Sequence, residues 1–505
     1  MVQLIPNGHS QKASLDRVLV HGIAWAGGMR WLAQGIAWLS SLIIVRLLQP
    51  EDYGLVAMAG TYLALVQLTF EFGLGATVLT RPLDKIQLAQ INSFCALLGL
   101  GGFLLSLMVS VPIALFFDAP ELRWVVVVMS VSLLLSAFRT VPYALLEREL
   151  RFKFLAVLET AQALIQAFCM ILFAFFGFGY WTLVFGGLIG GALSTVVVVI
   201  KHPCAFAWPS RQSLSGGALT FGWQVLASRL SWYVQTQSHF LIGGHLFGTA
   251  ALGAYSVAWS LASLPVEKVT AFVGRVSFPF FASIQNDSAS LRRYYLGLTE
   301  SLGLATFGPA VGLAVVAEEF VAIVLGDKWL GAVLPLQLLA LSATFRSIDP
   351  MLAQLLFVRS EAGYYMRVMI VAAVALVGSF AFLSQWGIAG LAAVWIVVYP
   401  LTTLPVYRRV FHSLELSWKE FLKALQPALN ASLIMAVVTM GLKLILPVDW
   451  PMTLRLATEV LTGGTAYLGT LLLFYGDRLA AFRNYAGSFR SQPMTMLPVD
   501  TKHPT

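Results

Sequence analysis

Four basic residues interrupt long apolar runs of the sequence: Arg30, Arg229, Lys268 and Arg275. An ionised side chain at the centre of a bilayer costs at least about 2.5–3.5 kcal/mol, so each of these groups needs a charged partner or water. The planar guanidinium of arginine matches two phosphate oxygens at once. The four residues therefore predict a cationic cavity for an anionic ligand that carries phosphate. Pairing with structural carboxylates, for example Arg30 with Glu71, is the alternative.

Four further polar residues stand within or near apolar runs: Glu71, Gln235, His239 and Glu300. We expect them to line a hydrated cavity or to take part in ion coupling, because polar groups are costly in lipid. The stretch from Ser228 to His239 is unusually polar, so one side of its helix cannot face lipid. His239 suits a hydrogen-bonded position in a cavity wall, or a proton relay.

The sequence has no motif for enzymatic chemistry. A GxxxxGK[ST] phosphate loop, a GxSxG elbow and an HExxH metal site are all absent. Cys95, Cys169 and Cys204 form no metal-ligand or disulfide pattern and are expected to be small buried hydrophobes. Glu318 and Glu319 are expected to be solvated at a helix end. We therefore expect a protein that is not an enzyme and that has no cofactor and no metal.

The composition requires a surface that faces lipid. The chain of 505 residues is 58% hydrophobic and 11% charged, with a mean hydropathy of +0.80, whereas soluble domains carry about 25% charged residues. A helix that crosses the hydrocarbon needs about 20 apolar residues, because every backbone polar group must be satisfied within it. The apolar runs predict an all-α integral membrane protein with about fourteen transmembrane helices, at 18–46, 53–80, 88–117, 121–146, 152–176, 180–201, 214–245, 250–281, 294–325, 331–358, 362–384, 387–407, 421–446 and 453–475.

Lysine and arginine orient these helices, because cytoplasmic loops carry an excess of both. With the N-terminus in the cytoplasm, 21 of the 32 basic residues fall on cytoplasmic segments, 5 on outer segments and 6 inside helices. This prediction places both termini in the cytoplasm. The net charge of +8 then reflects topology and anionic lipid, so no nucleic-acid partner is expected.

An internal repeat divides the chain. Identities recur at an offset of 199 residues: Leu47 with Leu246, Gly54 with Gly253, Ala59 with Ala258, and Arg30 with Arg229. Six helices per half keep both halves in one orientation, as a parallel repeat does, although small residues can also coincide by chance. We expect an N-lobe at 18–202 and a C-lobe at 214–412. The remaining parts are a cytoplasmic tail at 1–17, a linker at 203–213, two extra helices at 413–476 and a cytoplasmic tail at 477–505.

Three motifs resemble those of a known family. They are Arg46–Gly54 (RLLQPEDYG), close to R-L-L-x-P-x-D-[FY]-G, then Glu71–Ala76 (EFGLGA) and Arg275–Gln285 (RVSFPFFASIQ). The chain resembles, over 18–412, the Wzx-type polysaccharide flippases of the multidrug/oligosaccharidyl-lipid/polysaccharide exporter superfamily. The resemblance implies two six-helix lobes around a cationic cavity and transport by alternating access. The four cations are assigned by charge and depth, and Lys268 has the least support among them because no family motif covers it.

The resemblance also implies a substrate and partners. The substrate would be an undecaprenyl-diphosphate-linked oligosaccharide repeat unit, moved across the bacterial inner membrane for capsule, O-antigen or exopolysaccharide synthesis. A polysaccharide polymerase and a co-polymerase would share the membrane, and H⁺ or Na⁺ would be the coupling ion.

Three alternative functions differ from a flippase in what they require of the sequence. A multidrug or cation antiporter of the same fold would favour acidic residues in its cavity, whereas the intramembrane charge here is mostly basic. The second is a membrane enzyme, such as a polysaccharide polymerase or an acyltransferase; polymerases of this pathway usually need a long outer loop, and the sequence has none. A structural scaffold would have no reason to keep charges inside the membrane.

Overall fold

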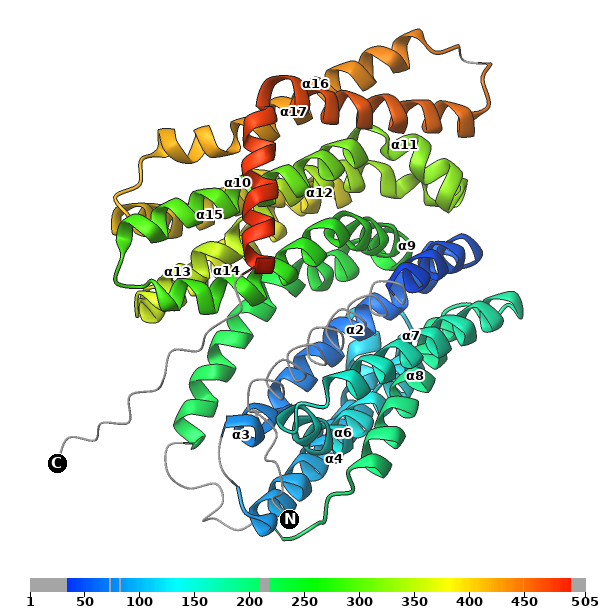
Figure 1. The fold of residues 1–505 in the computed structure, drawn as a ribbon. Helices are drawn as coiled ribbons and strands as arrows, with labels where there is room; N and C mark the ends of the chain where they lie inside the picture. The colour runs from blue at the N-terminus through cyan, green and yellow to red at the C-terminus, as the bar shows by residue number, and fades with distance from the viewer. Residues whose placement is uncertain (1–33, 72–73, 81–82, 209–217, 448, 492–505) are drawn as a thin grey trace, which may run out of the picture. The chain divides into compact units, whose positions relative to one another are not determined.

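The computed structural model describes residues 34–71, 74–80, 83–208, 218–447 and 449–491 (Figure 1). These ranges contain helices and no strands, so the prediction of an all-α protein is confirmed. Within them, ten helical segments are long and apolar enough to cross a membrane, and a shorter apolar helix occupies Gln34–Leu47. The chain is a multi-pass membrane protein, while the count of fourteen helices, the lobes and the orientation of the termini stay predictions.

The first part of the described chain is a series of helices joined by short connections (Figure 1). They are α2 (Pro50–Glu71), α3 (Leu74–Thr80), α4 (Lys85–Phe116), α5 (Leu122–Met129), α6 (Val131–Arg148), α7 (Phe152–Phe175) and α8 (Trp181–Lys201). The helices α4 and α6 pack against each other, and so do α7 and α8.

The second part contains longer helices and one irregular segment. Its elements are α9 (Ala218–Ser283), α10 (Ser288–Val315), α11 (Ala317–Phe320), the π-helix η1 (Val321–Leu325), the 3₁₀-helices η2 (Asp327–Ala332) and η3 (Ser384–Trp386), α12 (Val333–Arg346), α13 (Asp349–Val358), α14 (Ala362–Leu383), α15 (Gly387–Ser413), α16 (Trp418–Ile445) and α17 (Met452–Ser491).

Two of these elements are interrupted helices. In α9 the break is at Gly248, with φ 74° and ψ −173°, a conformation that glycine adopts without steric cost. The break falls between the two predicted spans 214–245 and 250–281, so α9 supplies both of them. In α17 the break is at Tyr475, directly at the predicted end of the last span.

Helix starts follow from local side-chain chemistry. Ser417 and Glu420 form a capping box at α16, in which Glu420 Oε2 accepts the Ser417 N–H at 3.0 Å. Asp287 caps α10 by accepting the N–H of Ser290 at 3.0 Å. Hydrogen bonds from Ser290 hold the pKa of the Asp287 carboxyl below its usual range. Pro50 opens α2, at the position where its missing N–H costs nothing.

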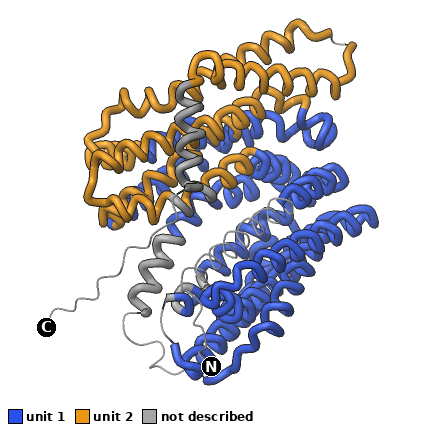
Figure 2. The backbone as a smooth tube through the Cα atoms, viewed as in Figure 1, with its two compact units in different colours: residues 1–261, 320–339, 363–403 blue, residues 262–319, 340–362, 404–505 orange. Residues whose placement is uncertain are grey.

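The chain forms two compact units, one of residues 1–261, 320–339 and 363–403 and one of residues 262–319, 340–362 and 404–505 (Figure 2). A core cluster of the first unit joins α3, α4 and α6 through Val78, Ile91 and Val141. Cys95 belongs to it, and its predicted burial is confirmed, whereas Cys169 and Cys204 are only half-buried. A core cluster of the second unit joins α16 and α17 through side chains that include Ala431, Met435, Tyr467 and Leu471.

Candidate functional site

The two copies of the sequence repeat contact each other through their glycines. A Cβ atom added at Gly54 would lie 1.9 Å from the carbonyl oxygen of Thr249, and one added at Gly253 would lie 1.7 Å from that of Pro50. Pro50 and Thr249 are themselves 199 residues apart, so the contact is reciprocal. Each glycine lies against the first residue of the other copy's helix. Only glycine permits this approach of two backbones.

The first copy of the motif is held by the irregular segment at 320–332. The Arg46 guanidinium donates a hydrogen bond to the carbonyl of Ile323. The fully buried Trp329 donates its Nε1–H to the carbonyl of Val45 at 3.0 Å. The Trp329 ring also meets Tyr53 edge-to-face, with 5.5 Å between ring centroids. These contacts fix the turn into α2, which explains the aromatic and basic residues of the motif.

Of the four predicted cavity cations, only Lys268 has a described side chain. Arg30 lies outside the described residues. The backbones of Arg229 and Arg275 belong to α9, but their side chains lie outside the described part. Lys268 is also on α9, with an exposed side chain, seven residues before Arg275, which is about two helical turns. The cationic cavity stays a prediction.

Gln235 and His239 lie in the first part of α9, and both are buried. Gln235 donates Nε2–H to the carbonyl of Met369 in α14 at 2.7 Å. His239 Nε2 lies 2.8 Å from the carbonyl of Thr236. Because a carbonyl only accepts hydrogen bonds, Nε2 carries the hydrogen. Five aromatic rings surround the imidazole, from Phe240, Tyr255, Trp259, Phe380 and Trp395.

The two acidic residues predicted to line the cavity, Glu71 and Glu300, lie in α2 and α10. Glu71 is the last residue of α2, and its side chain lies outside the described part. Glu300 lies within α10 and is half-buried. The cavity and coupling roles of Glu71, Glu300, Gln235 and His239 stay predictions.

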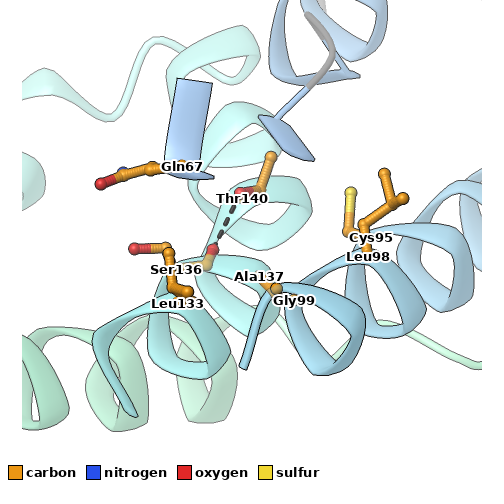
Figure 3. A pocket seen from close by; sticks show the side chains of 9 residues that line it. Gln67, Cys95, Leu98, Gly99, Leu133, Ser136, Ala137 and Thr140 are labelled. Carbon is orange, nitrogen blue, oxygen red and sulfur yellow. Dashed lines mark hydrogen bonds between the residues drawn. The ribbon is translucent and has the colours of Figure 1, made fainter. Parts of the chain in front are cut away.

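A small cavity lies between α2, α4 and α6 (Figure 3). Its volume is about 30 Å³, which is room for one or two water molecules. Gln67, Ser136 and Thr140 supply its polar groups, and the Thr140 hydroxyl donates to the Ser136 carbonyl at 2.8 Å. It is too small for a sugar, so we interpret it as a gap in helix packing.

The second unit contains a buried ion cluster that was not predicted from the sequence. The expectation that Glu319 is solvated is wrong: its side chain is 7% exposed and forms an ion pair with Lys443 at 2.5 Å. Glu318 is exposed, as expected. Glu459 of α17 completes the cluster with a side chain that is 0% exposed. A carboxylate within the apolar run 453–475 was the signal that could have found it.

Comparison with known proteins identifies the family. The sequence profile of a family described as polysaccharide biosynthesis protein matches residues 43–334, which is more than half of the chain. The chain belongs to this family. The matched region contains both copies of the repeat motif and the reciprocal glycine contact.

Curated members of similar sequence come from bacterial polysaccharide pathways. The lipopolysaccharide biosynthesis protein WzxC of Escherichia coli (strain K12) is 25% identical over 356 residues, which cover 69% of this chain and 71% of WzxC. The succinoglycan biosynthesis transport protein ExoT of Rhizobium meliloti (strain 1021) is 26% identical over 65% of this chain and 66% of ExoT.

Solved structures share the fold. The lipid II flippase MurJ, in an inward closed conformation, superimposes with a TM-score of 0.72 at 14% identity, over 89% of this chain and 99% of MurJ. An inward-facing multidrug resistance MATE family transporter, itself a member of the MOP superfamily, gives a TM-score of 0.54 at 16% identity, over 76% of this chain and 96% of the transporter. These two likenesses show the fold, while the resemblance to polysaccharide exporters that the sequence motifs carry is confirmed by the family match over residues 43–334.

Proposed function

We propose that this protein moves undecaprenyl-diphosphate-linked oligosaccharide repeat units across the bacterial inner membrane by alternating access. The units would serve the synthesis of surface or exported polysaccharide. The observation that carries the proposal is the family match over residues 43–334. The names of two relatives support it, because WzxC belongs to lipopolysaccharide biosynthesis and ExoT is a transport protein of succinoglycan biosynthesis.

The substrate sets two chemical requirements on such a protein. The polyprenyl tail can stay in the lipid, but the diphosphate and the sugars must cross a region where charge is costly. We assign the diphosphate to Arg30, Arg229, Lys268 and Arg275, since charge-assisted hydrogen bonds from guanidinium groups are the strong contacts available to it. The exposed side chain of Lys268 in α9 supports this assignment.

The proposal extends to the surroundings of the protein. Both termini would be cytoplasmic, a polymerase and a co-polymerase would receive the exported units, and H⁺ or Na⁺ would couple transport to a gradient. In this function the protein makes and breaks no covalent bond.

A multidrug antiporter is the second candidate. The observation in its favour is the fold shared with a multidrug resistance transporter, at a TM-score of 0.54. Such a protein would export cations, which the four basic residues would repel. The family match and the basic intramembrane residues therefore favour an anionic lipid-linked substrate.

Deletion of the gene, followed by complementation, tests the proposal. We expect loss of the polysaccharide and retention of the lipid-linked intermediate in the inner leaflet. Arg229→Ala and Arg275→Ala should fail to restore the polysaccharide at normal expression. Arg123→Ala is the matched control, because Arg123 is exposed in the first turn of α5 and the variant should restore the polysaccharide. Unchanged polysaccharide would refute the function, and repeat units in the outer leaflet without polymer would identify a polymerase.

A further inference from the structure

The long helices α10, α16 and α17 meet, together with Glu319 of the short helix α11, at a buried group of charges in the second unit. Lys443 of α16 donates hydrogen bonds to the carbonyl of Val315 at 2.8 Å and to Glu319 Oε2 at 2.5 Å. Glu459 of α17 places its Oε2 atom 3.8 Å from the same Nζ atom. The helices α10, α16 and α17 pack against one another around this group.

Glu459 is the unusual member of the group. Its side chain is 0% exposed, and neither carboxyl oxygen has a hydrogen-bond partner in the structure. A distance of 3.8 Å to the ammonium is beyond hydrogen-bond range. Burial of an ionised carboxylate without hydrogen bonds is strongly unfavourable, so this carboxyl needs either a nearby cation or a proton.

Opposing charges keep the ionised form accessible. The charged groups around Glu459 are Lys443 from α16, Glu319 from α11 and Arg455 from one turn earlier in α17. The two cations favour the carboxylate, whereas burial and Glu319 favour the acid. A carboxyl held between these opposing influences can gain and lose a proton reversibly. A metal cation does not suit the site, because the Lys443 ammonium already supplies its positive charge.

We propose that Glu459 is a proton-binding site, at which the buried carboxylate takes up one proton from water to form the carboxylic acid. Lys443 and Glu319 are positioning groups that set its proton affinity. Proton binding does not depend on the identity of the transported molecule. We also propose that binding of this proton couples transport to a proton gradient, and this part rests on the proposed function.

Infrared spectroscopy of the purified full-length protein tests proton binding. A pH titration should show the carbonyl stretch of a buried carboxylic acid, shifted in D₂O, and Glu459→Gln should abolish it. Glu318→Gln is the matched control, because it changes an exposed carboxylate beside the cluster and should leave the band intact. A band that survives Glu459→Gln would overturn the proposal.

Two variants that keep Glu459 provide a second test. Glu319→Gln removes a competing carboxylate, so the midpoint of the acid band should fall by about one pH unit or more. Lys443→Met removes the cation, so the midpoint should rise by a similar amount. An acid band that arose from a carboxyl remote from Glu319 and Lys443 would shift with neither variant. If Glu459→Gln does not fold, the midpoint shifts in Glu319→Gln and Lys443→Met test proton binding at Glu459 instead. The absence of both shifts would refute the proposed proton-binding site.

Proteoliposomes test the link to transport. The probe is undecaprenyl diphosphate that carries a short labelled glycan, with its sidedness measured with and without a proton gradient. Glu459→Gln should keep the slow movement without a gradient and lose its acceleration by the gradient, whereas Arg229→Ala should lose both. Full acceleration in Glu459→Gln would overturn the coupling role. A wild-type protein that does not move the probe would refute the proposed function, while the infrared result would still decide proton binding.

Discussion

The reciprocal glycine contact gives a prediction that can be worked out from distances. In Gly54→Ala, the new Cβ would lie 1.9 Å from the Thr249 carbonyl oxygen, whereas real Cβ contacts essentially never fall under 3.0 Å. The start of α2 must therefore move away from the second copy of the repeat by more than about 1 Å. Overpacking of this kind costs about 1–3 kcal/mol, and the obstacle is backbone, which cannot rotate away.

The matched control lies on the same helix. Gly60 has no atom within 4 Å of its added Cβ, so Gly60→Ala should be neutral or should stabilise α2 by about 0.5–1 kcal/mol, because alanine is the better helix former. Thermal unfolding of the detergent-solubilised protein measures both variants. We expect a clear loss of thermal stability for Gly54→Ala alone.

Because the contact is reciprocal, the effects of substituting Gly54 and Gly253 should be coupled. Gly253→Ala meets the Pro50 carbonyl oxygen at 1.7 Å and should be relieved by the same separation of the two segments. The double variant Gly54→Ala/Gly253→Ala should therefore cost less than the two single changes together, as expected for coupled neighbours. Equal stability of Gly54→Ala and Gly60→Ala, or strict additivity of the double variant, would refute the reasoning.

Three further predictions concern the helix ends and the clamped motif. Trp329→Phe keeps the ring but leaves the buried Val45 carbonyl without its donor, so stability should fall by about 1–3 kcal/mol; no change in thermal unfolding would contradict the clamp. Ser417→Ala removes one half of a capping box and should lower the stability of α16 by about 1 kcal/mol, visible as faster amide exchange in its first turn. Hydrogen bonds from Ser290 lower the pKa of the Asp287 carboxyl. The ionised carboxylate therefore stabilises the fold at pH values above the usual pKa of about 3.9. This stabilisation is lost as the pH falls through the lowered pKa. In Asp287→Asn, which can still cap α10, that part of the acid dependence of unfolding should disappear, and a retained dependence would assign it to other groups.

The helical architecture was predictable because it depends on local composition. A run of apolar residues long enough to cross the hydrocarbon forms a helix whatever its neighbours are. The break at Gly248 fell where the sequence separated two spans, because a glycine between apolar runs permits the turn. The number of helices that cross the membrane depends on how interrupted elements such as α9 are divided, so local composition predicts it less well.

The ion pair between Glu319 and Lys443 is a long-range contact that could not be predicted from the sequence. Glu319 stands at the end of a helix and lacks a local partner, so solvation was the natural expectation. Its partner Lys443 lies 124 residues later, and nothing in either segment marks the pairing. A long-range contact between unlike residues leaves no periodic signal, which is why both the partner and the burial of Glu319 were missed.

The repeat behaves differently, because a contact between two copies of one motif leaves the same residue in the sequence twice. The residues that are identical in the two copies differ in how far they are buried. Ala59 and Ala258 are both 0% exposed, five residues after the contacting glycines, whereas Leu47 and Leu246 are 38% and 52% exposed. The glycines are thus required by the close approach of the two copies and the alanines are fully buried, while an exposed leucine in a membrane protein needs no explanation beyond lipid. The evidence for an internal repeat therefore depends on Gly54, Gly253 and the two alanines, and an enlarged side chain at any of these positions should be tolerated less well than a change at either leucine.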